Sequence, residues 1–257
     1  MLHRAREIAY RKLTHLNFRR RQECLTLLRW LDAQPGERIL DIGSGDGWWD
    51  HRIARAGCTV VGVDINDKAL AIADRRNRTE RTEFHAMNAE ELDFAAASFD
   101  RAISMCVIEH FHREDRVLEN ISRVLKPAGR FVLSADSLTN PELSARERDD
   151  HRRRYAVNTF YTIDVLRHKL DAAGFDLEHA EYILTTPLTL GLARLSWRMD
   201  DLADSRKPVA GAIGEVVNAL IHTVGKVASD LSEGMFGRSD TGLTILARAR
   251  KRGTPPG

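Results

Sequence analysis

The sequence predicts an α/β fold with a doubly wound, mostly parallel seven-stranded sheet. Short apolar runs alternate with amphipathic runs from Arg38 to Ala135, and a glycine-rich loop directly follows the first apolar run. Two more strand-like runs lie nearer the C-terminus. Alternation of this kind is typical of parallel strands joined by right-handed crossovers, with helices on both faces of the sheet.

The elements follow in order. The region before Arg38 reads as a helical extension. Apolar runs predict five strands, at 37–42, 59–65, 82–87, 99–105 and 129–136. Helices are expected after the glycine-rich loop, over 67–76 and over 113–125. The last of these ends at Lys126-Pro127, because the residue before a proline disfavours the helical conformation.

The second half of the chain is less regular. The polar, Pro-broken stretch 137–155 reads as a loop or lid. A helix is expected over 162–173, ending near Gly174, then a sixth strand at 176–186 and a last strand at 242–250. A long helical insertion separates these two strands. Its second helix carries an apolar stripe at helical spacing: Val209, Ile213, Val216, Val217, Leu220, Val224, Val227 and Leu231. Core packing is the first expectation; a homodimer face, a lipid-pocket wall or a membrane-surface contact stay open.

Composition narrows the function classes. The net charge of +2 gives no global nucleic-acid signature. The basic N-terminal stretch fits a solvated helix face, or attraction to an anionic substrate or membrane surface. Three scattered cysteines without a CxxC pair argue against disulfides or zinc and fit a reducing cytoplasm. No run of about 18 apolar residues occurs, so a membrane-spanning helix is not expected.

The loop DIGSGDGWWD carries the chemical signal. Its glycines, Gly43, Gly45 and Gly47, are spaced one residue more tightly than in a dinucleotide fingerprint. Asp41 and Asp46 would repel a pyrophosphate by on the order of a kcal/mol or more. The loop therefore suits a nucleoside ligand that lacks phosphate and carries positive charge, as S-adenosylmethionine does.

From about Arg38 to Ala135 the chain resembles the class I S-adenosylmethionine-dependent methyltransferases, whose fold is Rossmann-like. ILDIGSGDG is similar to their first motif, and VVGVDI ends in an acidic residue like the one that binds the ribose hydroxyls. MNAEEL resembles the segment that contacts adenine, although the family more often has Asp where this chain has Asn88. SFDRAISMCVIEHF and LKPAGRFVLS resemble the later motifs. The resemblance implies these cofactor-binding residues: Asp41, Gly43, Gly45, Asp64, Ile65, Asn88, Ala89, Glu90 and Met105.

The resemblance also suggests how the chain divides. We expect one methyltransferase domain with a helical N-terminal cap (1–37), a cofactor-binding core (38–136) and a lid with the C-terminal core (137–186). The remaining parts are the helical insertion (187–240), the last strand (241–250) and a disordered tail (251–257).

Methyl transfer requires the acceptor to be held close to the methyl group, and a hydroxyl acceptor also needs a base. His110 is the best-placed candidate, with pocket shaping at a helix start as its alternative role; Glu109 and His112 are weaker. Asp136 could orient a substrate or ligate a metal, or cap a loop, and no metal site is expected. The basic stretch His151–Tyr155 fits a solvated loop or a clamp on a substrate phosphate or carboxylate.

A small-molecule acceptor is favoured, with O-methylation of a lipid, isoprenoid, sugar or natural-product intermediate. No nucleic-acid methyltransferase motif occurs. For the apolar insertion (187–240), a peripheral membrane or lipid contact and a homodimer both stay open. Two other functions stay open: a nicotinamide-dependent oxidoreductase, and a non-catalytic protein that binds the cofactor or a protein partner.

Overall fold

The computed structural model describes the backbone of residues 18–203, 208–236 and 239–253, and within the insertion it leaves the side chains of 202–216 and 218 undescribed. The N-terminal residues up to 17, where much of the predicted basic cap falls, and the end of the predicted tail (254–257) lie outside the described residues.

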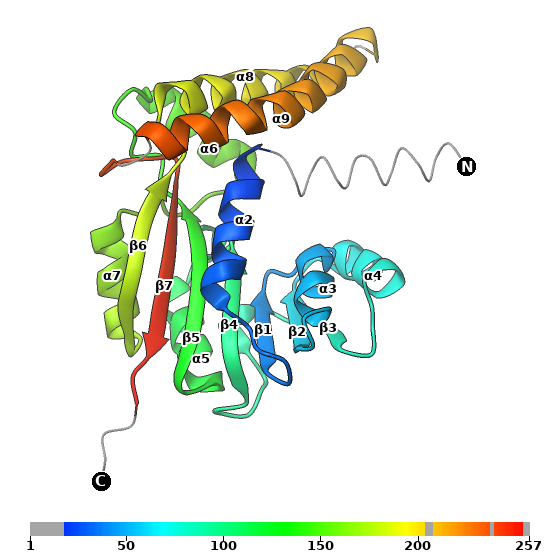
Figure 1. The fold of residues 1–257 in the computed structure, drawn as a ribbon, viewed down its shortest axis with the longest axis vertical. Helices are drawn as coiled ribbons and strands as arrows, with labels where there is room; N and C mark the ends of the chain where they lie inside the picture. Colours follow the sequence, from blue (N-terminus) through cyan, green and yellow to red (C-terminus); the bar gives the residue numbers. More distant parts are fainter. Residues whose placement is uncertain (1–17, 204–207, 237–238, 254–257) are drawn as a thin grey trace. The chain divides into compact units, whose positions relative to one another are not determined.

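A seven-stranded sheet forms the centre of the fold, in the order β3-β2-β1-β4-β5-β7-β6 (Figure 1). The pairs β3–β2, β2–β1, β1–β4 and β4–β5 are parallel, and β7 runs antiparallel to β5. The predicted doubly wound, mostly parallel sheet is therefore confirmed. The strand bounds are β1 Arg38–Ile42, β2 Thr59–Asp64, β3 Thr82–Ala86, β4 Phe99–Met105, β5 Leu125–Asp136, β6 Phe175–Ile183 and β7 Thr244–Lys251.

Helices occupy the connections between the strands. Short 3₁₀ turns follow β3 and β4, at the same sheet edge as the glycine-rich loop. The helix bounds are α2 Phe18–Leu31, α3 Trp48–Ala54, α4 Asp67–Arg76, η1 Ala89–Glu91, η2 Ile108–His110, α5 Glu114–Val124, α6 Ala145–Tyr155, α7 Ile163–Ala172, α8 Pro187–Ala203 and α9 Pro208–Phe236. Among the described residues, no helix is both long and apolar enough to cross a bilayer.

The chain divides into two compact units. One comprises the sheet with its crossovers, residues Thr26–Glu181 and Thr244–Gly257. The other comprises α8 and α9 within Tyr182–Leu243, together with residues 18–25 at the start of α2. In the sheet unit, β1 and β4 are adjacent, and their apolar side chains, such as Leu40 and Ile103, are fully buried. The parallel strands therefore open their carboxyl ends along one edge, where ligands bind in such sheets.

The predicted polar loop before Tyr155 is in part a helix, so that prediction was wrong for α6. Ser144 and Glu147 form a capping box at its start: Ser144 Oγ accepts a hydrogen bond from the Glu147 backbone N–H, and the Glu147 carboxylate accepts one from the Ser144 N–H. Such a box satisfies two backbone donors that a helix start otherwise leaves unpaired. Ala156 ends the helix in a left-handed conformation.

The apolar stripe of α9 is not core, contrary to the expectation from periodicity. Four of its described members, Leu220, Val224, Val227 and Leu231, are 58–67% exposed, and Val217 is half-buried. The small residues of the helix supply the packing face instead: a Cβ added at Gly225 would lie 3.3 Å from Leu192 Cδ2 of α8. Small side chains let two helix backbones approach closely, which explains why this face is the buried one. Buried small residues of this face are Gly225, Ser229 and Ser232.

Candidate cofactor and acceptor site

The glycine-rich loop turns sharply where β1 ends. Gly43, Gly45 and Gly47 have φ values of 74°, 56° and 70°, a left-handed conformation that glycine adopts without steric penalty. Two consecutive N–H groups, those of Gly43 and Ser44, donate to the Val63 carbonyl at 2.8 and 3.1 Å. The loop is thereby tied to β2, so its backbone is held in place before any ligand arrives.

The glycines of the loop have different surroundings. A Cβ at Gly43 would lie 2.4 Å from Val107 Cγ2, and one at Gly47 would lie 2.5 Å from Phe84 Cζ. A Cβ at Gly45 would meet nothing within 4 Å. Gly43 and Gly47 are therefore required by packing, whereas Gly45 borders open space that a ligand could fill.

Asp46 helps to begin α3. Its Oδ1 accepts a hydrogen bond from the Trp48 N–H at 3.2 Å, and its carbonyl accepts one from Asn77 Nδ2 at 2.5 Å. Gly47, at the N-cap position, has no side chain to supply this bond. Asp46 thus has a structural role in addition to the negative charge that it places in the loop.

Asp64, at the end of β2, joins two backbone segments. Its Oδ2 accepts a hydrogen bond from the Gly45 N–H and its Oδ1 accepts one from the Asn66 N–H, both at 2.8 Å. The side chain is half-buried. The N-cap of α4 is Asn66, so Asp64 does not cap this helix. An ionised carboxylate has acceptor capacity for further hydrogen bonds, such as those of a vicinal diol.

The predicted adenine contacts lie beside Asp64. Ile65 is 74% exposed, so it is not a core residue, and its side chain is available to cover a ligand ring. Asn88 is exposed and caps η1, where its Oδ1 accepts from the Glu90 N–H at 3.0 Å. Ala89 is buried. The Glu90 carbonyl is tied to α5 by Arg116 Nε and Asn120 Nδ2, each at 2.9 Å.

Asp41 lies under the loop and is paired with another carboxyl that sequence reasoning missed. Asp41 and Asp50 are both fully buried. Burial, the charge of Asp50 and a hydrogen bond to it raise the pKa of Asp41 well above its ordinary value. Burial raises the pKa of Asp50 to about 7. Asp50 could have been noticed from the sequence, because it is an acidic residue directly after two tryptophans at the start of a short helix.

The acceptor side of the site lies where β4 ends. Met105 is half-buried, and Cys106 follows with a φ of 51°, a conformation uncommon for a non-glycine residue. The Cys106 N–H donates to Ser134 Oγ of β5 at 2.9 Å. His110 ends η2 and lies 3.2 Å, through its Nδ1, from the Ala156 carbonyl oxygen. A carbonyl can only accept, so this ring nitrogen is the donor.

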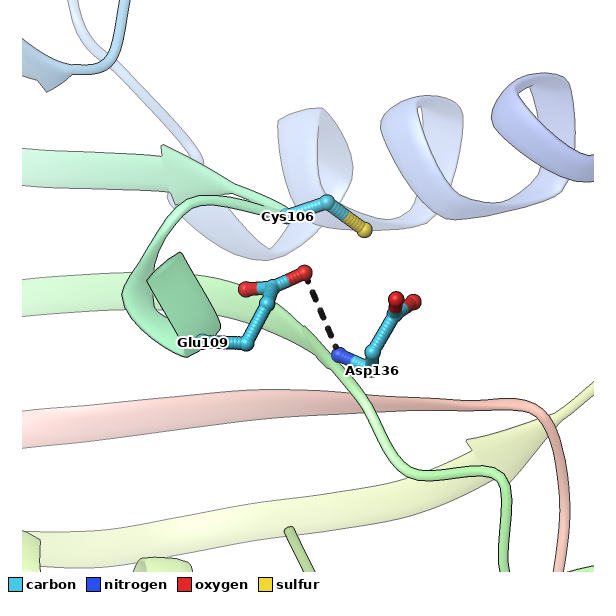
Figure 2. A group of neighbouring side chains, drawn as sticks. All are labelled: Cys106, Glu109 and Asp136. Atoms are coloured by element: carbon cyan, nitrogen blue, oxygen red, sulfur yellow. Dashed lines mark hydrogen bonds between the residues drawn. The ribbon is translucent and has the colours of Figure 1, made fainter. Parts of the chain in front are cut away.

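Cys106, Glu109 and Asp136 converge at the ends of β4 and β5 (Figure 2). One potential ligand atom from each lies within 4.8 Å of the others, so these side chains could hold a metal ion. Glu109 also has a structural role, because its Oε1 accepts from the Asp136 backbone N–H at 3.3 Å. Asp136 Oδ2 lies 2.7 Å from Nε2 of the buried His151 in α6. This hydrogen bond fastens α6 to the sheet, and the sequence predicts a loop at His151.

The structure thus brings the predicted cofactor residues together at one edge of the sheet, after β1, β2, β3 and β4. The loop fits a cationic nucleoside ligand by two observations. Gly45 borders open space. The charges that shift the pKa values of the buried carboxyls Asp41 and Asp50 are acidic: Asp50 and Asp64 act on Asp41, and Asp46 acts on Asp50. His110 lies at the same edge, after β4.

Comparisons with known proteins agree with this geometry. Residues 40–133 match the family described as "Methyltransferase domain". "Methyltransferase GfsG" of Streptomyces halstedii is 27% identical over 76% of this chain and 66% of its own length. "Ubiquinone biosynthesis O-methyltransferase" of Agrobacterium fabrum is 36% identical over 37% of this chain and 38% of its own length. A solved S-adenosylmethionine-dependent methyltransferase from Mesorhizobium loti has a TM-score of 0.62 at 21% identity, covering 89% of this chain and 97% of that one.

The matches to the two sequence relatives thus span about two thirds or less of their lengths, and the likeness to the solved structure concerns the fold alone. The family match covers β1 through most of β5, the part of the chain that forms the glycine-rich loop, the Asp64 contacts and the end of β4. Residues 40–133 thus form a methyltransferase domain of the S-adenosylmethionine-dependent type, and S-adenosyl-L-methionine is the cofactor of this core.

Proposed function

We propose that this chain transfers the methyl group of S-adenosylmethionine to a hydroxyl oxygen of a small molecule, with His110 as the general base. Bound S-adenosylmethionine supplies a methyl group that is already activated by its sulfonium. The protein's task is to hold the acceptor in line with that methyl group, exclude water and accept a proton. Positioning of this kind can supply about 7–11 kcal/mol of the barrier reduction.

The single observation that carries this proposal is the contact of His110 with Ala156. Because Nδ1–H donates to a backbone carbonyl at 3.2 Å, Nε2 is the unprotonated nitrogen of the neutral ring. A hydrogen bond made by one ring nitrogen of a histidine decides which of the two nitrogens carries the proton. His110 therefore offers a base at the end of β4, the edge of the sheet where the cofactor residues gather.

Two other groups support a closed acceptor site at this edge. The His110 carbonyl accepts a hydrogen bond from Asn158 Nδ2 at 2.6 Å, and the Glu109 carbonyl accepts from the Asn158 N–H at 2.8 Å. These bonds fix η2 against the segment after α6. A base held on a rigid turn can be aligned with its acceptor without further ordering.

One relative supports an oxygen acceptor, because it is named as an O-methyltransferase of ubiquinone biosynthesis. We extend this to an amphiphilic hydroxyl compound, such as a phenol with an isoprenoid tail or a polyketide. The lid carries Arg152, Arg153 and Arg154 in the last turn of α6, which would favour an acceptor bearing an acidic group.

The test is methyl transfer from S-adenosylmethionine labelled in its methyl group to a panel of such hydroxyl compounds. His110→Ala should lower kcat by about 10²–10⁴ while the affinity for S-adenosylhomocysteine changes little. His112→Ala is the matched control, because His112 is an exposed histidine two residues away, and it should retain activity. Full activity of His110→Ala would remove the base and leave only a pocket role for this histidine.

We also propose that the exposed stripe of α9 pairs with a second copy of the chain. The spacing of Val217, Leu220, Val224, Val227 and Leu231 alternates between three and four residues, which is the seam pattern of paired helices. A helix that lies on a membrane surface is typically rich in Lys and Arg on its polar face. The sequence of α9 contains a single one, Lys226, so helix pairing is favoured over a lipid surface.

Light scattering after size-exclusion chromatography tests this partner. We expect a dimer for the wild type and a monomer for Val227→Glu. Thr223→Glu is the control, because Thr223 is exposed on the same helix but outside the stripe. A monomeric wild type that sediments with anionic phospholipid vesicles would overturn the dimer in favour of a lipid contact.

A further inference from the structure

Two carboxyls from different elements meet beneath the glycine-rich loop. Asp41 is the fourth residue of β1 and Asp50 is the third residue of α3. Both are fully buried, and among the residues that the structure describes, no hydrogen-bond donor reaches Asp41 Oδ1 or either carboxyl oxygen of Asp50. The two groups can satisfy each other only when one of them is protonated and donates to the other.

The described charges that act on this pair are acidic. The charges that shift the pKa of Asp41 are those of Asp50 and of Asp64 on β2, and the charge of Asp46 in the loop acts on Asp50; all of them raise the pKa. In α3, the basic Arg52 lies over the rings of Trp48 and Trp49, 5.3 and 5.4 Å from their centroids. The residue after Asp50, His51, is half-buried.

A buried carboxylate without a counter-ion is costly, and the usual remedy is to retain a proton or acquire a cation. The ligand-free pair retains the proton. A cationic ligand group beside the pair would remove the reason for retaining it, because an opposite charge within about 4–6 Å favours the ionised form.

The position of the pair indicates which end of the cofactor would supply that cation. Asp64 lies at the end of β2 beside the exposed Ile65, where the nucleoside is expected. Asp41 leads directly into Gly43 and Gly45, where the backbone adopts positive φ values and Gly45 borders open space. The nucleoside is therefore expected beside Asp64, on the other side of the loop from the carboxyl pair. The amino-acid end of S-adenosylmethionine, which carries an ammonium, is then the end expected at the pair.

We propose that Asp50 is a cofactor-positioning residue of this chain: it shares a proton with Asp41 in the free protein, and the pair gives up that proton to solvent when the cofactor's ammonium binds. The step breaks one carboxyl O–H bond of the pair and forms a bond between that proton and a buffer base. One proton moves from the buried pair to the buffer, and the ammonium replaces it as the neutralising charge. The inference rests on the proposed binding of S-adenosylmethionine.

The consequence is that cofactor binding depends on pH. Burial raises the pKa of Asp50 to about 7 and that of Asp41 well above its ordinary value, so the free pair is protonated near pH 6.5. Binding near pH 6.5 should therefore release on the order of one proton, and the affinity should rise as the pH approaches 8.

Calorimetric titration of the full chain with S-adenosylhomocysteine tests this. This probe keeps the ammonium and undergoes no turnover. Titrations at pH 6.5 in phosphate and in imidazole, which differ in ionisation enthalpy, give the number of protons released. We expect about one proton for the wild type and close to none for Asp50→Asn, which can still donate and accept within the pair. Asp67→Asn is the control, because Asp67 is an exposed acid in the first turn of α4, and it should release the same number as the wild type.

A second ligand keeps the proposal testable if Asp50→Asn does not fold. Methylthioadenosine shares the nucleoside but lacks the amino acid, so the wild type should bind it without releasing a proton. Equal proton release with both ligands, or unchanged release in Asp50→Asn, would overturn the role of the pair. If neither ligand binds, the proposed cofactor is overturned, and this inference with it.

Discussion

The Asp64 carboxylate accepts a hydrogen bond from the Gly45 N–H at 2.8 Å, which joins the end of β2 to the loop after β1. The same carboxylate also accepts from the Asn66 N–H. One side chain therefore aligns the loop that approaches the cofactor and the turn that leads to α4. This arrangement explains how a short loop of small residues keeps a defined shape beside an open space.

Because Gly45 borders open space that a ligand could fill, a substitution there should weaken cofactor binding in addition to lowering stability. Gly45→Ala should cost roughly 1–2 kcal/mol of stability, because alanine is strained at a positive φ, and should also weaken S-adenosylhomocysteine binding about tenfold or more. Gly36→Ala is a matched control: Gly36 also has a positive φ and open surroundings, but it lies in the turn before β1. Urea denaturation should show similar losses for both variants, with only Gly45→Ala losing affinity in calorimetry.

Gly43 should be sensitive for another reason. Gly43→Ala places a Cβ 2.4 and 2.8 Å from the two Cγ atoms of Val107, so it should lower the free energy of unfolding by about 2–4 kcal/mol through overpacking and backbone strain. Adding Val107→Ala removes both clashing atoms. A double-mutant cycle by urea denaturation should then show that the double variant loses less than the sum of the single losses. Strict additivity would mean that the contact with Val107 is not the cause.

The buried carboxyl of Asp50 predicts how stability varies with pH. Its pKa is raised from the ordinary 3.8 to about 7 by burial. Between these values the unfolded chain loses its proton while the folded state keeps it, so the free energy of unfolding should fall as the pH rises from about 4 to 7. Because one pKa unit is about 1.4 kcal/mol, the loss is at most about 4 kcal/mol.

Asp50→Asn removes this titration, so the variant should gain stability relative to the wild type as the pH rises. Denaturant unfolding at pH 5 and pH 8 measures the difference. The exposed control Asp67→Asn should follow the wild type. A constant difference between Asp50→Asn and the wild type at the two pH values would contradict the burial of an ionisable carboxyl at this position.

The His151–Asp136 pair predicts how firmly α6 is held. His151→Ala removes a buried contact of 2.7 Å between the helix and the end of β5, so α6 should open more often. Since α6 contains several arginines, limited digestion with trypsin should cut it several-fold faster than in the wild type. His168→Ala, an exposed histidine on α7, should leave the rate unchanged. Equal rates for both variants would show that the pair does not fasten the helix.

The sheet and the cofactor edge follow from local sequence patterns. The fourth strand matches its predicted bounds, because β4 is apolar and lies between clear turn signals. Parallel strands with their ends at one edge bring Asp64 and the residues after β3 together without any knowledge of side-chain contacts. The exposure of Ile65 agrees with a ligand-facing role that the family resemblance had implied.

Other features depend on contacts that patterns do not contain. Periodicity identified the apolar stripe of α9, but α8 packs on the small residues around Gly225 instead, and spacing alone does not tell which face a neighbour covers. The Asp41–Asp50 pair depends on the direction in which α3 leaves the loop. The α6 helix did have a local signal, Ser144 with Glu147 three residues later, which the charged composition of the segment obscured.

We expect the acidic glycine-rich loop to bind a cationic nucleoside and to reject a dinucleotide. Calorimetric titration with S-adenosylmethionine, S-adenosylhomocysteine and NAD tests it most directly, with Asp64→Ala and Asp67→Ala as variant and control. We predict binding of the first two ligands, weakened about tenfold or more by Asp64→Ala but not by Asp67→Ala, and no binding of NAD. Binding of NAD without the sulfonium ligand would contradict the claim and favour a nicotinamide-dependent oxidoreductase.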